Sequence, residues 1–134
     1  MGGQDSGTTA QTEIESLTFS TEVTSVISAV LPVARKNQSA CYSSTKGYNL
    51  GGNGSTVVYS LTFAGESVAT VSASLGHPVG QSQGSNSSAT KGYVYGEFGQ
   101  AGKEIQALTF AGEGIATLAA TVSNNSDSHA GFQG

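Results

Sequence analysis

The side chains best suited to nucleophilic or soft-metal chemistry are Cys41, His77 and His129. No local motif connects them, and a single cysteine can form neither an internal disulfide nor a cysteine-based zinc site. In this setting a buried thiol and two surface histidines are the ordinary outcome. We therefore expect no catalytic residue, no metal site and no cofactor.

The acidic residues give no acid–base pair either. Glycoside cleavage requires two carboxyl groups that face each other across the substrate. Glu13 and Glu15 flank one expected strand, whereas Glu66 and Glu113 occupy equivalent turns of a repeat. The glycine-rich run GGNGS, residues 51–55, lacks the lysine and the helix of a phosphate-binding loop. These patterns indicate that the protein is not an enzyme.

The amino-acid composition limits which kinds of molecule the protein is expected to bind. Only 10% of the 134 residues are charged, 19 are glycine, and the net charge is −4. The five basic residues form no stripe, so no nucleic-acid partner is expected. No apolar run approaches the roughly 18 residues of a transmembrane helix, and no signal peptide is evident. We expect a virion or soluble protein with no membrane partner. The start MGGQDS fits a myristoylation pattern, but its Gly2-Gly3 pair also aligns with the repeat.

Two sequence blocks recur and set the organisation of the chain. SSTKGYNLGG at 43–52 returns as SATKGYVYGE at 88–97 and, more divergently, as SDSHAGFQG at 126–134. Between these copies the LTF block places Phe19, Phe63 and Phe110 at spacings of 44 and 47 residues. A period of about 40–50 residues built from short strand-like runs is typical of propeller blades or β-arrays. We expect a single domain of three repeats, at about 1–52, 53–97 and 98–134.

Each repeat predicts four short strands. A polar turn leads into an LTF strand, a tight turn and a β-branched strand, and after a variable loop come a small-residue strand and the KGY strand. Val57, Tyr59, Leu61 and Phe63 alternate with other residues, which predicts a half-buried strand. IATLAATV at 115–122 could be helical on propensity alone. The aligned run VTSVISAV at 23–30 is rich in β-branched residues and favours a strand.

The order of these elements resembles the kelch-type blade. The closer similarity is to the kelch-like SST-x-GY-x-x-GG repeats found in tandem in many phage-associated and bacterial proteins. The chain departs from the kelch pattern in having no tryptophan and a shortened third repeat. The resemblance implies an all-β fold of propeller-like repeats, in which Tyr48 and Tyr93 pack between blades. Gly51 and Gly52 are expected either to adopt positive φ, which other residues avoid, or to lie where blades crowd near the axis.

Three repeats are too few for a closed ring, because propellers usually have four to eight blades. In the kelch-like register the chain holds two whole blades between two halves, at Glu13–Ala29 and near Ser126–Gly134. Each half would expose a strand edge. We therefore expect a homodimer of six blades, in which the C-terminal strands of each copy complete the N-terminal blade of the other.

Two classes of function follow from these expectations. The first is a non-catalytic structural or assembly protein, such as a phage tail, fibre or capsid-decorating component, whose partners are itself and other virion proteins. The alternative is a lectin-like module that binds glycans through inter-blade loops, because sugars stack on rings and bond to amides. Variable loops on a constant scaffold tend to carry specificity. The candidate ligand-binding residues are Arg35, Lys36, Asn37, His77, Gln81 and Gln83, with Tyr48 and Tyr93 as scaffold or stacking floor.

Overall fold

The chain is all-β, as its sequence predicts. The computed structural model describes residues 1–80, 84–95 and 103–123, which contain β-strands and no helix. The twelve strands are β1 (Gly3–Gln4), β2 (Ala10–Gln11), β3 (Glu15–Thr18), β4 (Val23–Val26), β5 (Ser39–Tyr42), β6 (Lys46–Leu50), β7 (Val58–Thr62), β8 (Ser67–Thr70), β9 (Gly84–Ser87), β10 (Lys91–Tyr95), β11 (Glu104–Thr109) and β12 (Gly114–Thr121).

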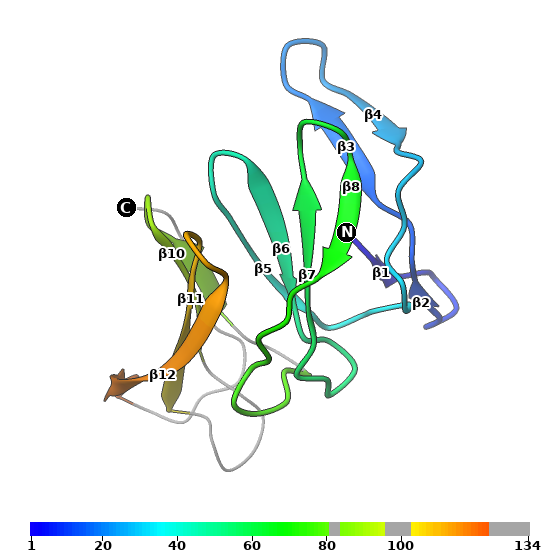
Figure 1. Cartoon of the computed structure of the whole chain (residues 1–134). Coiled ribbons are helices and arrows are strands. Elements are labelled where there is room, and N and C mark those ends of the chain that lie inside the picture. Colours follow the sequence, from blue (N-terminus) through cyan, green and yellow to red (C-terminus); the bar gives the residue numbers. More distant parts are fainter. Residues whose placement is uncertain (81–83, 96–102, 124–134) are drawn as a thin grey trace.

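These strands form four small antiparallel sheets. β5–β8 and β9–β12 are four-stranded meanders, which we call the middle sheet and the third sheet. β3 pairs with β4 to form the first sheet, and β1 pairs with β2 in a short ribbon that the sequence analysis did not predict. The first, middle and third sheets lie side by side in that order (Figure 1). The prediction of four strands per unit is confirmed in the middle and third sheets, and the run 115–122 is indeed extended, within β12 and just beyond it.

Repeated turns explain why the strands recur. In the SST turn, the Ser43 hydroxyl accepts a hydrogen bond from the backbone N–H of Lys46 at 3.0 Å. In the SAT turn, Ser88 does the same for Lys91, also at 3.0 Å. A hydroxyl that bonds to the backbone two or three residues ahead favours a turn over a continuing strand. Ser43 and Ser88 therefore stabilise equivalent turns, which connect β5 to β6 and β9 to β10.

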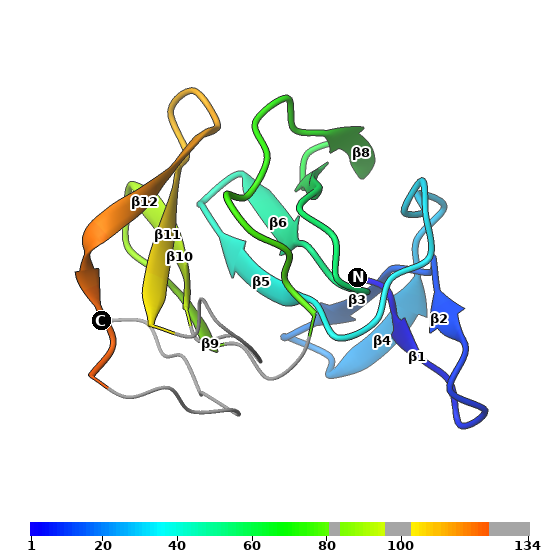
Figure 2. The same cartoon turned by 90° about the horizontal axis from the view of Figure 1, so that it is seen from below.

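The middle sheet has buried side chains on both of its faces. Its hydrophobic side chains contribute to two separate clusters, one shared with the third sheet and one shared with the first. Within β7, Val58 and Ser60 are as deeply buried as Tyr59. The expectation of a half-buried β7 is therefore wrong. A strand between two neighbouring sheets has no solvent face, and a period-2 pattern cannot show what lies against its second face. Figure 2 shows the middle sheet between its neighbours.

The Gly51-Gly52 pair adopts the predicted left-handed conformations, with φ of 67° and 89°. The N–H of Gly52 donates to the carbonyl of Val79 at 2.8 Å. The earlier pair repeats this arrangement, because Gly3 N–H donates to the carbonyl of Arg35 at 2.8 Å. Gly3 and Gly52 thus each bond to a variable loop, and Gly52 does so at the end of the KGY strand β6.

The first sheet lies within residues 13–29, where the sequence analysis expects an N-terminal half-blade. It has two strands, where the middle and third sheets have four. The expected C-terminal half near Ser126–Gly134 lies outside the described residues. Within the described residues, no helix is long and apolar enough to cross a membrane.

Candidate functional site

The contact between the middle and third sheets combines a ring stack, an ion pair and hydrogen bonds between strands. Tyr48, from β6, is 1% exposed and stacks on Phe110, which follows β11. The ring centroids lie 5.4 Å apart at an interplanar angle of 8°. Aromatic pairs of this kind contribute about 0.5–1.5 kcal/mol beyond the area they bury. The sequence-based expectation that Tyr48 packs between successive units is therefore met by this stack.

An ion pair closes the outer end of the same contact. Lys46 Nζ lies 2.7 Å from Glu113 Oε1, and the Tyr48 hydroxyl donates to the same oxygen at 3.3 Å. Burial, then the Glu113 carboxylate, raises the pKa of Tyr48 to about 12. Glu113 is itself a turn residue, and its φ is 53°. Glu22 and Glu66 occupy the same turn elsewhere, with φ of 54° and 46°.

The inner strands of the two sheets also interlock. The backbone N–H of Tyr42 donates to Ser87 Oγ at 2.9 Å, and Ser85 Oγ donates to the carbonyl of Ala40 at 2.6 Å. Gly92 lies against Cys41 so closely that a Cβ at Gly92 would overlap the cysteine sulfur. Glycine is therefore required at position 92 by the approach of the neighbouring sheet.

Cys41 is a packing residue in this contact. Its side chain is buried in the cluster that the two sheets share. Burial raises the pKa of its thiol to about 12, so the reactive thiolate is scarce at neutral pH.

We expect native protein at pH 8 to react with a thiol reagent such as Ellman's reagent at least a hundred times more slowly than the unfolded chain, because a thiol with a pKa near 12 is seldom ionised. The measurement is the release of the chromophore over time with and without denaturant. Rapid labelling of the folded protein would show that Cys41 is accessible and ionised.

His77 belongs to the loop between the middle and third sheets. Its Nε2 lies 3.1 Å from Glu104 Oε2 and 3.0 Å from the side-chain nitrogen of Gln106. Gln106 is fully buried, and its Oε1 also accepts from the N–H of Gly76. The sequence analysis did not identify Glu104 and Gln106, because their link to His77 depends on how the loop folds back on β11.

The predicted ligand-binding residues of the first variable loop lie at different depths. Arg35 is buried, and its guanidinium donates to the carbonyl of Gly52 at 3.3 Å and to Tyr59 Oη at 3.4 Å. Lys36 Nζ donates to the carbonyl of Thr8 at 2.9 Å. Asn37 is exposed, with φ of 55°. Of these three side chains, only Asn37 projects into solvent.

The remaining predicted residues are divided between two places. Gln81 and Gln83 lie outside the described residues. Tyr93 occupies the position in β10 that Tyr48 holds in β6, but it is half-buried and lines a hollow on the face of the third sheet that points away from the middle sheet. The two variable loops meet at Gly52, whose carbonyl accepts from Arg35 and whose N–H donates to the carbonyl of Val79.

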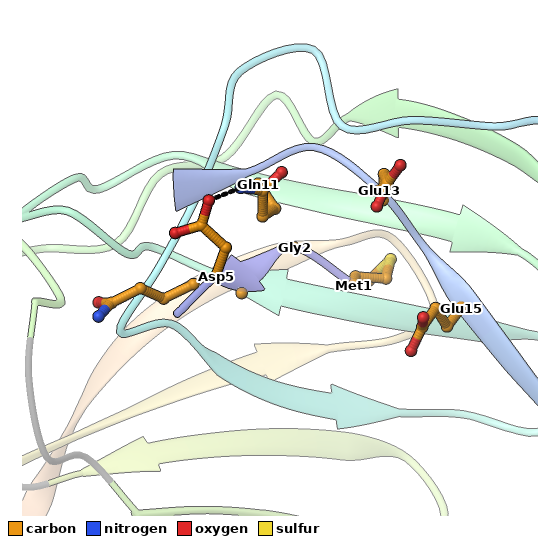
Figure 3. A pocket seen from close by; sticks show the side chains of 8 residues that line it. Met1, Gly2, Asp5, Gln11, Glu13 and Glu15 are labelled. Atoms are coloured by element: carbon orange, nitrogen blue, oxygen red, sulfur yellow. Dashed lines mark hydrogen bonds between the residues drawn. The ribbon is translucent and has the colours of Figure 1, made fainter. Parts of the chain in front are cut away.

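Two hollows lie beside the N-terminal residues Met1 and Gly2. One, of about 460 Å³, is lined by acidic side chains that include Asp5, Glu13 and Glu15 beside Met1 (Figure 3). Asp5 is engaged by the backbone N–H groups of Gly7 and Thr9 and by Gln11. In the described ranges, no three acidic, histidine or cysteine side chains are placed to hold a metal ion.

The second hollow, of about 530 Å³, lies against the face of the middle sheet that carries Gly47 and Asn49. Asn49 is fully buried, and its amide has no hydrogen-bond partner in the described part of the chain. The ring of Phe63 covers Gly47, as the ring of Phe110 covers Gly92. This surface is therefore built like the surface that receives Tyr48 on the third sheet.

A repeat-to-repeat comparison could have found part of the inter-sheet contact in advance. The KGY block and the LTFAGE block recur together, which makes pairing of their lysine, tyrosine, phenylalanine and glutamate reasonable. The comparison cannot show that the KGY block of one sheet meets the LTFAGE block of the next rather than its own. A search of protein-family models gave no match to this chain, and neither did a search of curated proteins.

Proposed function

We propose that this chain is a non-catalytic assembly protein whose sheets are successive blades of a β-propeller, closed when two copies join. Its similarity to kelch-like repeats of phage-associated proteins favours a virion component. Side chains of reactive or ionisable types, such as Cys41 and the Lys46–Glu113 pair, form contacts between the middle and third sheets. This use of reactive groups for packing supports a structural role.

The observation that carries the proposal is the exposed apolar surface of the first sheet. Leu17 is 49% exposed, and Val26, which lies on the same face by strand register, is 57% exposed. Phe19, just after β3, is 87% exposed. Large apolar patches on a soluble protein mark contact surfaces. A protein with only 10% charged residues has few ways to keep such a patch from associating. The first sheet is thus the expected place of self-association.

The repeated architecture supports the propeller interpretation. The middle and third sheets are meanders of the same strand order, and their β5 and β9 strands contact each other. Propeller blades are four-stranded sheets arranged around a common axis, usually four to eight in number. Two copies of this chain would supply six.

We expect the purified chain to have a solution mass of two 13.4 kDa chains, because the exposed face of the first sheet is buried only in an assembly. Multi-angle light scattering at several concentrations measures this mass. Negative-stain electron microscopy of the same sample should show a compact ring. A stable monomer at about 100 μM would contradict closure by self-association.

The virion role requires a separate test. Phage particles from the host that carries the gene would be purified, and their proteins identified by mass spectrometry. Stoichiometric presence of the chain supports a structural component. Its absence from particles that contain the neighbouring gene products would contradict the virion role and leave the assembly itself untouched.

A lectin-like module is the second candidate. The face of the third sheet that points away from the middle sheet has a hollow of about 230 Å³ lined by Asn86, Tyr93 and Tyr95 among others. Aromatic rings beside an amide are the groups that sugars use for stacking and hydrogen bonding. A glycan array with the parent and Tyr93→Ala tests this function. Glycan binding that is lost in the variant would favour the lectin over the assembly protein.

A further inference from the structure

The first sheet repeats the backbone arrangement of one half of the middle sheet. The carbonyl of Ile14 accepts from the N–H of Ile27 at 3.0 Å. At a shift of 44 residues, the carbonyl of Val58 accepts from the N–H of Val71 at 2.9 Å. The same shift superimposes β4 on β8 and β3 on β7. β3 and β4 are therefore the counterparts of β7 and β8.

One edge of β3 has no strand beside it in the described part of the chain. β7 lies between β6 and β8, whereas β3 pairs with β4 alone among the described strands. The N–H of Phe63, at the end of β7, donates to the carbonyl of Thr45 at 3.0 Å. The equivalent N–H of Phe19 makes no backbone hydrogen bond with a described residue. The side of β3 that corresponds to the β6 side of β7 is therefore open to strand pairing.

A groove lies beside this edge, between the first and middle sheets. A hollow of about 290 Å³ is lined by Glu15 of β3 and by Phe63 and Glu66 of the middle sheet, among others. It adjoins the hollow of about 530 Å³ over Gly47 and Asn49, because Phe63 lines both. Phe63 is 47% exposed. We call these two hollows together the β3 groove.

The wall of the groove that the middle sheet forms repeats the surface on which Tyr48 packs. In that contact Tyr48 stacks on Phe110, and Lys46 pairs with the glutamate of the turn after β11. The counterparts in the groove are Phe63 and Glu66, from the matching LTFAGE block. Glu66 has a similar φ, 46° against 53°, and makes no ion pair with a described residue. The groove thus presents the partners of a tyrosine and a lysine but neither of those two side chains.

An amide without a hydrogen-bond partner lies in the groove. Asn49 is 1% exposed and lines the larger hollow. Neither its side-chain nitrogen nor its side-chain oxygen has a partner in the described part of the chain. Its counterpart on the third sheet is Val94, whose side chain has no polar atom. A buried amide left unpaired is destabilising, so Asn49 points to a ligand that supplies both a donor and an acceptor. The backbone of an extended strand supplies both.

We propose that the β3 groove binds an extended strand of another protein chain, antiparallel to β3, whose sequence runs lysine, glycine, tyrosine. The register of β6 on β7 aligns this strand, with its lysine opposite Thr18 and its tyrosine opposite Ser16. The tyrosine then stacks on Phe63, and the lysine pairs with Glu66. In strand addition the backbone bonds give affinity and the side-chain positions give specificity. The inference rests on the assembly proposed above, because it names the groove by which the first sheet joins a neighbouring chain.

A synthetic peptide tests the groove directly. The probe is fluorescein-labelled SSTKGYNLGG, the sequence of residues 43–52. Fluorescence anisotropy follows its binding to the full chain, in dilute samples whose mass is measured in parallel by sedimentation velocity. We expect saturable binding, which Phe63→Ser weakens about tenfold, because aromatic anchors dominate interfaces. Val33→Ser is the matched control and should leave binding unchanged, since Val33 is 52% exposed but lies in a loop outside the groove.

An exchange of charges tests the pairing with Glu66. Glu66→Lys should weaken peptide binding several-fold. A peptide with glutamate in place of its lysine should bind this variant as the original peptide binds the parent, because opposite charges face each other again. Such restored binding also shows that the variant is folded.

Asn49→Val separates a binding role of the amide from a structural one. The substitution installs the residue found at position 94 and removes an unpaired buried amide. The melting temperature of the unbound chain should therefore rise, while its affinity for the peptide falls several-fold. A lower melting temperature would show that the amide has a partner inside the chain, which contradicts its role in binding.

Two results would overturn the groove. One is the absence of binding to monomeric protein at about 1 mM peptide. The other is a dimeric parent whose mass and peptide binding are unchanged by Phe63→Ser and Glu66→Lys, which leaves the proposed assembly standing with its contact elsewhere. A monomeric parent that binds the peptide, in contrast, supports the groove and contradicts self-association.

Discussion

Tyr48→Ala is expected to lower the free energy of unfolding by about 3–5 kcal/mol, the range for removing a buried aromatic side chain. Tyr48 is 1% exposed and stacks on Phe110 at 5.4 Å, so truncation leaves a cavity between two sheets. It also removes a hydrogen bond to Glu113. Urea unfolding followed by circular dichroism measures the loss.

Tyr48→Phe is the control that keeps the ring. It should cost about 1 kcal/mol, the contribution of one hydrogen bond to a charged group at a partly solvated site. The pKa of Tyr48 is raised from 10.0 to about 12, so the folded state favours the neutral phenol. Stability from this group is present below pH 10 and is lost as pH rises toward 12, where the unfolded chain ionises first. Tyr48→Phe should flatten that part of the pH profile. Equal losses for Tyr48→Ala and Tyr48→Phe would contradict the packing role of the ring.

Gly51→Ala is expected to destabilise the fold by about 2–5 kcal/mol. Position 51 has φ of 67°, which costs a residue with a Cβ about 1–2 kcal/mol. A Cβ there would also overlap Val79 and approach the carbonyl oxygen of Ser55 to 2.7 Å, which adds overpacking of about 1–3 kcal/mol. The measurement is again the free energy of unfolding.

Gly54→Ala separates these two causes. Gly54 has nearly the same φ, 69°, but a Cβ there meets nothing within 4 Å. Only the conformational cost of about 1–2 kcal/mol should remain. If Gly51→Ala were no worse than Gly54→Ala, the close approach of the 77–80 loop to the glycine pair would not be a stabilising contact.

Periodicity and repeat alignment predicted the local structure well. The SSTK and SATK blocks contain a serine that turns the backbone at both positions, so equivalent sequence gives equivalent hairpins. The alignment of 115–122 with β-branched runs correctly favoured a strand. Local hydrogen bonding and side-chain branching act over a few residues, and such effects can be inferred from sequence.

The candidate site was predicted less completely. Burial of Tyr48 between units follows from its repetition, but its partners Phe110 and Glu113 do not. Arg35 illustrates the opposite difficulty. A charged residue in a variable loop is usually exposed, yet its guanidinium lies over the Tyr59 ring at 5.5 Å and bonds inside the fold.

The sequence by itself determined that the chain is all-β, that its strands recur with a period near 45 residues, and that its glycine pairs need positive φ. These properties depend on short-range sterics and hydrogen bonding. Only the tertiary structure decided that the middle sheet has buried side chains on both faces while Phe19 of the first sheet is exposed. The three LTF blocks and the KGY blocks are nearly identical locally. What differs is which neighbour packs against each, and that depends on contacts between residues far apart in the chain.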